Sequence, residues 1–581
     1  MCPTTILFQP IMINTENPGV NGIPADARPH SGVRLPFGKF FSDSPSMNRL
    51  ARLTSWLLGI RSTWLVAAIT FAWVAATTWT RPLMLPDEGR YVGVAWGMLK
   101  TGHDWVPRLD GLPFFHKPPL FYWITALSLR LFGANEWAAR LCSVLAATLM
   151  VAMLFWFLKT FANRRVAVLA AIILATAPFF VGGGQYANLD MTVAAAITAT
   201  VVLGAAAVFR IEAGGPYRLL LTLAYATAGL GFLSKGLIGI VLPGGIVVFW
   251  LAGRKRFDLM RRMFIWPGFV ALAVVALPWM AYMEWRFPGF FHYYVVYQQF
   301  DRFLETSFNN RQPFWFYVPV LLALTLPWSI QVWCLARSVY WKSPEFGAIR
   351  GLMVSWFLVV LIFFSIPSSK LIGYILPLLP PFAFFLADVF AVRLTGENTQ
   401  RTLASLSRHW ALSVALCVVA VIVLAVAPRP STKGLAKQLR SRYQPTDQIV
   451  MLDYYYYGFN FYLHAAKPSI VVSDWANPKI PLHDNWRKEL YDAGKFDAAK
   501  AARLLITPRT FLNRLCSQRS TNLWLIGDKD SFYELRFLKT RPATLKSQKF
   551  LAWFIPAGES FSFCPRIPKN PPKKASVKGA A

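Results

Sequence analysis

The chain has 581 residues, 55% of them hydrophobic, and a mean hydropathy of +0.40. Soluble globular domains are usually about 45–50% apolar, so this composition excludes an ordinary soluble enzyme and predicts an integral membrane protein. The net charge is +32, from 60 Lys and Arg against 28 Asp and Glu. These basic residues are scattered among the loops between apolar runs, which argues against nucleic acid binding and predicts contact with anionic lipid headgroups.

Residues 1–55 form the first predicted segment, and they are rich in Pro, Asn and Ser. They do not have the form of a signal peptide, because the first hydrophobic run comes too late in the chain. We expect a disordered cytoplasmic tail here. The first apolar run after it is expected to act as an uncleaved signal anchor.

Residues 56–428 contain the apolar runs that define a membrane region. Runs of about 18–22 residues are long enough to cross a hydrocarbon core of roughly 30 Å. Residues 118–132 are also apolar, but this stretch is short and includes Arg130, so we expect an interfacial or re-entrant helix there. In chain order, about eleven spans are predicted, at residues 62–80, 137–158, 166–181, 191–209, 218–233, 237–252, 264–283, 314–335, 351–366, 371–391 and 410–427.

The orientation follows from Lys and Arg, which gather in alternate loops, for example at 164–165, 254–262 and 393–408. Cytoplasmic loops carry an excess of these residues, so we place those loops and the N-terminus in the cytoplasm. An odd number of spans then puts the C-terminal region in the periplasm.

Residues 429–564 combine β-like runs with a helical stretch near residues 485–503. The pattern predicts a small periplasmic α/β domain, in which the tyrosines at 454–457 can stack on sugar rings or simply pack. Cys516 and Cys564 both lie in this domain and can form a disulfide if it is periplasmic. Residues 565–581 are rich in Pro and Lys, which predicts a disordered basic tail.

The predicted topology brings charged residues to the outer boundary of the membrane. Polar groups at this depth are costly unless they are paired or functional. A carboxylate there can act as the general base for an acceptor hydroxyl, and cations can hold a phosphate leaving group. The candidates are Asp87, Glu88 and Asp190 for catalysis, with Arg90, His116, Lys117, Lys235, Arg302 and Lys370 around them.

Each of these candidates also has a purely structural interpretation. Asp87 and Glu88 follow Pro86, so they can simply begin a helix and complement its dipole. Asp190 can cap a helix, and the lysines can extend from apolar positions to the headgroups. Two carboxylates such as Asp87 and Asp190 are also what glycoside hydrolysis requires, so the residues alone leave that reaction open.

Several familiar motifs do not occur in the chain. It has no P-loop, no GxSxG and no HExxH, so ATP-driven transport and zincin chemistry have no support. It has no CxxC pair, which argues against a cysteine-based metal site. Nor does it have an internal repeat of the kind that builds many transporters.

Short motifs follow one another in a specific order, although each one alone is weak. They are PDEGRY at 86–91, DWVPRL at 104–109, HKPP at 116–119, SKG at 234–236, PFWFYVP at 313–319 and KLIGYILP at 370–377. On these motifs the chain resembles the aminoarabinose transferase (ArnT-like) branch of the GT-C membrane glycosyltransferases, which are relatives of protein mannosyltransferases. The resemblance covers about residues 62–400. It implies a GT-C fold with about 11–13 transmembrane helices and periplasmic interfacial helices.

The resemblance also implies roles for particular residues. In this family the first acidic residue after the first span is essential, and it corresponds to Asp87. Asp190 corresponds to the second conserved acid of the family. We expect the donor phosphate to be held by a group consisting of Arg90, Lys117, Lys235, Arg302, Lys370 and Tyr374.

The chain departs from the family at two positions that are implicated in a metal site. His116 stands where aminoarabinose transferases tend to have Glu, and Gln299 stands where they tend to have His. His116 can still ligate a divalent metal such as zinc, whereas Gln299 is a poor ligand for a transition metal. A metal is therefore a candidate cofactor through His116 alone.

The resemblance predicts an inverting glycosyltransferase of the bacterial inner membrane, which moves a sugar from undecaprenyl phosphate to lipid A on the periplasmic face. The best candidate for the sugar is 4-amino-4-deoxy-L-arabinose. We expect a monomer that contacts membrane lipids and no nucleic acid. Another glycolipid, a polysaccharide or a protein hydroxyl stays open as the acceptor. Two other classes also stay open: a flippase for lipid-linked sugars and a non-catalytic assembly subunit.

Overall fold

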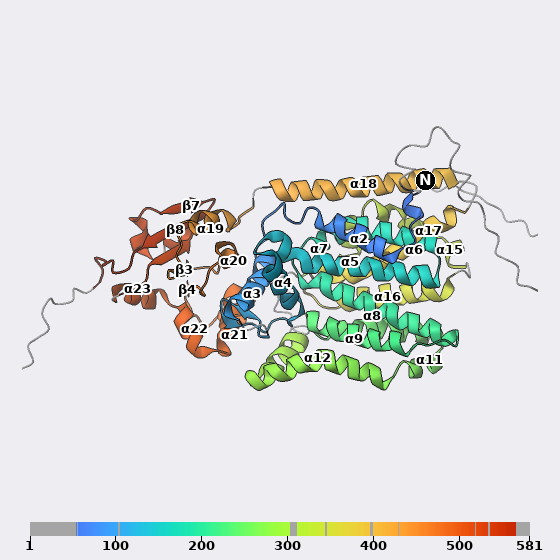
Figure 1. Cartoon of the computed structure of the whole chain (residues 1–581), viewed down its shortest axis with the longest axis horizontal. Helices are drawn as coiled ribbons and strands as arrows, with labels where there is room; N and C mark the ends of the chain where they lie inside the picture. The colour runs from blue at the N-terminus through green and yellow to red at the C-terminus, as the bar shows by residue number, and fades with distance from the viewer. Residues whose placement is uncertain are drawn as a thin grey trace, which may run out of the picture.

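The computed structural model describes residues 54–564, apart from residues 55, 103–104, 302–310, 343–345, 396–398, 428, 518 and 533–534. A bundle of helices and a mixed α/β unit lie end to end along the long axis of the molecule (Figure 1). Residues 1–53 of the predicted tail at 1–55, and the whole of the predicted tail at 565–581, fall outside the described residues.

Apolar sequence folds into the helices of the bundle, because a helix satisfies its own backbone hydrogen bonds where water is absent. Six helices of at least 18 residues are long and apolar enough to cross a membrane, or up to seven if the bent pair α6–α7 is one span, counted over the described residues. The chain is therefore a multi-pass membrane protein, as predicted. Long and short together, the α-helices of the bundle are α2 (Thr63–Ala75), α5 (Glu136–Phe161), α6 (Arg164–Thr176), α7 (Pro178–Gly184), α8 (Leu189–Glu212), α9 (Arg218–Lys235), α10 (Ile238–Gly253), α11 (Phe257–Arg262), α12 (Trp266–Arg286), α14 (Tyr317–Leu324), α15 (Ser338–Lys342), α16 (Gly347–Ser365), α17 (Leu379–Arg393) and α18 (Thr399–Val426).

Proline residues divide two of the predicted spans. Helices α6 and α7 meet at an angle of 66°, and Pro178 begins α7. The predicted span at 314–335 consists instead of α14 and a 3₁₀ helix, Trp328–Ala336, with Pro327 between them. Proline lacks a backbone N–H and collides with the preceding turn, so an apolar run that contains it does not form one regular helix.

Helix α8 lies at the centre of the bundle, where it packs against α5, α9 and α10. It is rich in alanine, and small residues let helices approach one another closely. Its most apolar window is 89% buried, compared with 11% for α18. Helix α18 therefore offers most of its apolar surface to lipid, and it runs along one edge of the bundle in Figure 1.

A small layer between α2 and α5 covers the end of the bundle that faces the α/β unit (Figure 1). It consists of α3 (Asp87–Thr101), β1 (Arg108–Leu109), β2 (Leu112–Pro113) and α4 (Leu120–Phe132), the last of which covers the predicted interfacial or re-entrant stretch. Asp110 and Gly111 join β1 to β2 with φ values of 51° and 79°. Positive φ at both central residues is what a two-residue type I′ hairpin turn requires.

The C-terminal unit is built on a six-stranded sheet of order β5-β4-β3-β6-β8-β7, in which β5, β4, β3 and β6 are parallel and β8 is antiparallel to β6 and β7. This sheet and its helices confirm the predicted α/β fold class. The strands are β3 (Gln448–Leu452), β4 (Ile470–Val472), β5 (Leu505–Ile506), β6 (Leu523–Gly527), β7 (Leu545–Ser547) and β8 (Phe550–Ile555), and the helices are α19 (Lys433–Arg440), α20 (Phe459–Leu463), α21 (Trp486–Lys495), α22 (Ala498–Leu504) and α23 (Pro508–Cys516).

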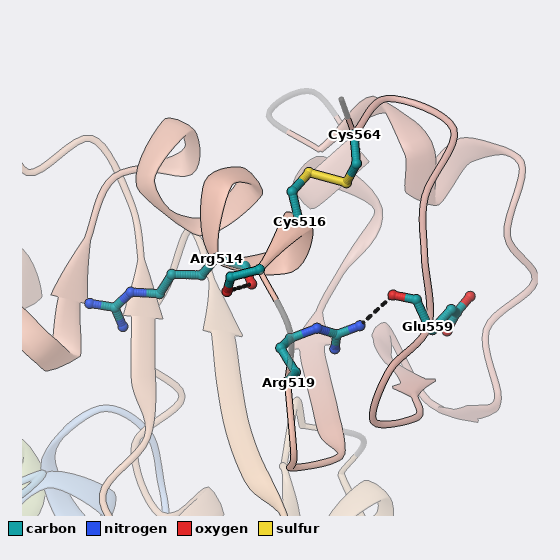
Figure 2. The surroundings of a disulfide bond; sticks show 6 residues. Arg514, Cys516, Arg519, Glu559 and Cys564 are labelled. Atoms are coloured by element: carbon teal, nitrogen blue, oxygen red, sulfur yellow. Dashed lines mark hydrogen bonds between the residues drawn. A yellow bond between two sulfur atoms is a disulfide. The ribbon is translucent and has the colours of Figure 1, made fainter. Parts of the chain in front are cut away.

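A disulfide ties the end of α23 to the segment that follows β8. It joins Cys516 and Cys564, whose Cα atoms are 5.3 Å apart (Figure 2). Beside it, the guanidinium of Arg519 donates to the backbone oxygen of Glu559 at 2.9 Å, a contact that Figure 2 also shows. The predicted pairing of the two cysteines is therefore confirmed.

Candidate active site

A buried ionic cluster holds the start of α3. Glu88 is fully enclosed and accepts hydrogen bonds from Arg81 at 2.5 Å and from Nε and Nη2 of Arg140 at 2.8 Å. The backbone N–H groups of Met84 and Ala187 donate to the same carboxylate, at 2.8 and 2.9 Å. Burial alone would raise the pKa of Glu88, but the guanidinium groups of Arg140 and Arg81 bring it down to about 2. This geometry favours a positioning role for Glu88 over the catalytic role predicted for it.

Asp87, the preceding residue, has the opposite environment. Its side chain is 42% exposed, and Arg90 donates to its Oδ1 at 2.5 Å from the next turn of α3. The other terminal nitrogen of Arg90 is bonded to Glu489, from α21 of the α/β unit. Burial lowers the pKa of Arg90, but Glu489 and the other acidic groups around it raise it well above its ordinary value. The helix therefore buries Glu88 and leaves Asp87 accessible, with Arg90 paired to two carboxylates.

A second group of predicted site residues meets where α8 begins and α9 ends. Asp190 forms an ion pair with Lys235, and both side chains are about nine-tenths buried. The ammonium of Lys235 also lies 4.1 Å from the centre of the Tyr374 ring. Asn188 caps α8 by accepting from the N–H of Asp190. Asp190 is therefore not the helix cap itself, and its carboxylate orients the lysine.

The two groups belong to one electrostatic environment. Tyr91 is buried in α3, which raises the pKa of its hydroxyl; Arg90 opposes this rise, and Asp87 and Asp190 both add to it. In the loop before α8, burial also raises the pKa of Tyr186, and Asp87 adds to that rise as well. Asp87 therefore acts on both tyrosines, and Asp190 acts with it on Tyr91.

His116, the one residue predicted as a metal ligand, does not belong to a metal-binding cluster among the described residues. His116 is buried and stacks on Phe114 with ring centroids 4.6 Å apart. Gln299, the other departure from the family, accepts a hydrogen bond from the N–H of Leu237 at 3.3 Å. Over the described part of the chain, no group of three His, Cys, Asp or Glu side chains is arranged to hold a metal ion. We therefore derive no step of the chemistry through a metal.

Two more of the predicted cations, Lys117 and Lys370, lie among the described residues. Lys370 is almost fully buried, with its ammonium on the backbone oxygens of Gln312 and Pro367, and burial lowers its pKa. Lys117 is half-buried, next to His116. Arg302 lies outside the described residues.

A cavity of about 340 Å³ lies between α3 and α4. Its apolar wall includes Met98, Trp105, Trp123 and Leu127, and Arg130 contributes a charge. Met98 is eleven residues beyond Asp87, which corresponds to roughly 16 Å along the helix axis. Met98 therefore places the cavity about three helical turns from the exposed carboxylate.

Sequence reasoning missed two residues of the site. Arg140 lies in the predicted span at 137–158, and an ionisable residue within an apolar run is itself a sign of a buried partner. Glu489 gave no such sign, because α21 is an ordinary polar helix far away in the chain. Its role in the site follows only from the tertiary contact between α21 and α3, where it pairs with Arg90.

Comparison with known proteins agrees with the fold. Residues 116–282 match the family model of dolichyl-phosphate-mannose-protein mannosyltransferases. The undecaprenyl phosphate-alpha-4-amino-4-deoxy-L-arabinose arabinosyl transferase of Aeromonas salmonicida (strain A449) is 32% identical over 363 residues, which are 61% of this chain and 64% of that protein. The protein of the same name from Enterobacter sp. (strain 638) is 34% identical over 60% of this chain and 61% of its own length. The chain thus spans less than two thirds of the length of these curated relatives.

The solved structures extend the likeness into the α/β unit. ArnT from Cupriavidus metallidurans, bound to undecaprenyl phosphate, matches with a TM-score of 0.71 and 21% identity over 86% of this chain and 98% of that one. The chain has the fold of ArnT. The apo form of the Cupriavidus metallidurans ArnT matches with a TM-score of 0.70 and 20% identity. The predicted GT-C fold and the resemblance to ArnT-like proteins are therefore confirmed.

Proposed function

We propose that the protein is a membrane glycosyltransferase that moves a sugar from undecaprenyl phosphate to lipid A, with 4-amino-4-deoxy-L-arabinose as the sugar. The observation that carries this proposal is the exposed carboxylate of Asp87, which Arg90 holds at the end of the bundle. Asp190, in its pair with Lys235, acts with Asp87 on the hydroxyl of Tyr91. The names of the relatives and the undecaprenyl phosphate bound to the ArnT of the same fold support the choice of donor and sugar.

The reaction requires one base and a set of cations. Asp87 accepts the proton of the acceptor hydroxyl, whose oxygen forms the new bond to the anomeric carbon. The bond from that carbon to the phosphate oxygen breaks at the same time, and undecaprenyl phosphate leaves with the electron pair. Attack on the face opposite the leaving group inverts the configuration at that carbon.

The leaving phosphate needs positive charge at the moment when the bond breaks. Lys235 is proposed to supply part of that charge, and Asp190 and the Tyr374 ring hold its ammonium in place. Lys117, Lys370 and Arg302 complete the proposed phosphate-binding group. Because Arg90 already pairs with two carboxylates, we assign it to the orientation of Asp87.

The protein is proposed to be a monomer in the bacterial inner membrane. Its N-terminus lies in the cytoplasm, and its site faces the periplasm. The Cys516–Cys564 disulfide supports this orientation, since disulfides persist in oxidising compartments such as the periplasm and are rare in the cytosol. The α/β unit that contains the disulfide contacts α3 directly, so both belong on the same side of the membrane.

Mass spectrometry of lipid A and total glycolipids tests the proposal in cells with and without the protein. Loss of a pentosamine from lipid A on deletion is the expected result. A sugar missing from another glycolipid, while lipid A is unchanged, would contradict the proposed acceptor. If every glycoconjugate is unchanged, the protein is not the transferase proposed.

A further inference from the structure

The α/β unit reaches the candidate site through one side chain. Glu489 projects from α21, and its side chain is only 8% exposed. Its Oε1 accepts from Nη1 of Arg90, and its Oε2 accepts from the hydroxyl of Tyr457. Tyr457 is itself buried in the same unit. Both oxygens of Glu489 are therefore engaged, and the carboxylate is fixed from both sides.

Arg90 bonds both Glu489 and Asp87, so the position of Glu489 affects the orientation of Asp87. A guanidinium is planar and holds its N–H donors in a fixed fork. Because Glu489 holds Nη1, the direction of Nη2 toward Oδ1 of Asp87 is also set. Of the three charged side chains Glu489, Arg90 and Asp87, that of Asp87 is the most exposed, at 42%, compared with 20% for Arg90.

The contact between the two parts of the protein is close at this point. A Cβ atom added to Gly89 would lie 3.0 Å from the Cβ of Tyr457 and 3.1 Å from its carbonyl carbon. The hydroxyl of Tyr462 accepts from the N–H of Leu83 at 2.7 Å, just before α3. The loop that holds Glu489 through Tyr457 is therefore in direct contact with the helix that carries Asp87.

We propose that Glu489 is a positioning residue for the transfer reaction. It holds Arg90 in the orientation in which one nitrogen bonds Oδ1 of Asp87, and Oδ2 is left for the proton of the acceptor. Without Glu489, Arg90 can turn both nitrogens toward Asp87 and form a bidentate pair, which occupies both oxygens of the base. This inference rests on the proposed glycosyltransferase function, and it gives the α/β unit a part in catalysis.

The test is Glu489→Gln in the full-length protein, with transfer rates measured over a range of donor concentrations. We expect kcat to fall roughly 10- to 100-fold, as for a displaced catalytic group. The KM for the donor should stay the same or fall, because an Arg90 released from Glu489 does not weaken phosphate binding. Tyr457→Phe, which removes one hydrogen bond to Glu489, should lower kcat in the same direction but by less.

Lys433→Gln is the matched control, because it breaks a different ion pair between the two parts, that of Lys433 with Glu136. It should lower the unfolding temperature without changing kcat. A wild-type kcat in Glu489→Gln, or an equal fall in kcat in the Lys433→Gln control, would overturn the inference. If Glu489→Gln does not fold, the same readouts on Tyr457→Phe decide. If the wild-type protein itself transfers no sugar, the proposed function fails instead.

Discussion

Replacing Glu88 with Gln tests the distinction between a buried and an exposed acid at the start of α3. The change removes the charge that two buried guanidinium groups share, those of Arg81 and Arg140. Removal of one partner from a buried ion pair costs about 3–5 kcal/mol. The fall in the pKa of Glu88 from 4.5 to about 2 corresponds to about 3 kcal/mol at 1.36 kcal/mol per unit. We therefore expect Glu88→Gln to lower the free energy of unfolding by about 3–5 kcal/mol.

Tryptophan fluorescence during unfolding in mixed micelles measures this loss. Asp258→Asn is the control, because Asp258 pairs with Arg256 at an exposed position where ion pairs contribute little. The pKa of Glu88 is depressed, so its contribution is complete above pH 4.5 and disappears as the pH falls toward about 2. Equal stabilities of Glu88→Gln and Asp258→Asn at pH 7 would refute the structural role of this cluster.

Three further predictions concern the α/β unit and its contacts with α3 and with the β1–β2 turn. Burial raises the pKa of Asp110 from 3.8 to about 7. The contribution of Asp110 to stability is therefore complete below pH 3.8 and is lost as the pH rises through 7. Asp110→Asn should remove this dependence in unfolding curves measured between pH 4 and 8. Cys516→Ser opens a disulfide with a sequence separation of 48 residues and should destabilise the unit by about 4 kcal/mol in the chain-entropy model; unchanged resistance to protease would contradict this. Gly89→Ala forces a Cβ against the backbone of Tyr457 and should cost about 1–3 kcal/mol, whereas wild-type unfolding would show that the contact is loose.

Much of the fold could be predicted from local sequence. Apolar runs indicated a multi-pass protein, and β-like runs with a helical stretch indicated the α/β unit. The location of two cysteines in a domain expected to be periplasmic made their disulfide possible. The bounds of the irregular spans were less predictable, because hydropathy measures only how apolar a run is. It does not show that Pro178 and Pro327 interrupt the helix. Attention to those prolines would have corrected the predicted boundaries.

The candidate site was predictable only as a set of residues on one side of the membrane. Asp190 and Lys235 were predicted separately, for catalysis and for phosphate binding, and the structure joins them in one ion pair. Glu88 and Asp87 are adjacent in the sequence, yet the helix turns one into the interior and the other toward solvent. Such pairings depend on tertiary contacts, which a single sequence does not display.

Asp87 is proposed to be the base of a glycosyl transfer from undecaprenyl phosphate. The most direct test supplies the purified protein with undecaprenyl phosphate–aminoarabinose and lipid A, and measures both the transfer of sugar and the binding of donor. The wild-type protein should transfer the sugar, and Asp87→Asn should lose at least about 100-fold in rate, as expected for a general base, while it binds the donor normally. Transfer at the wild-type rate by a correctly folded Asp87→Asn protein would contradict the account.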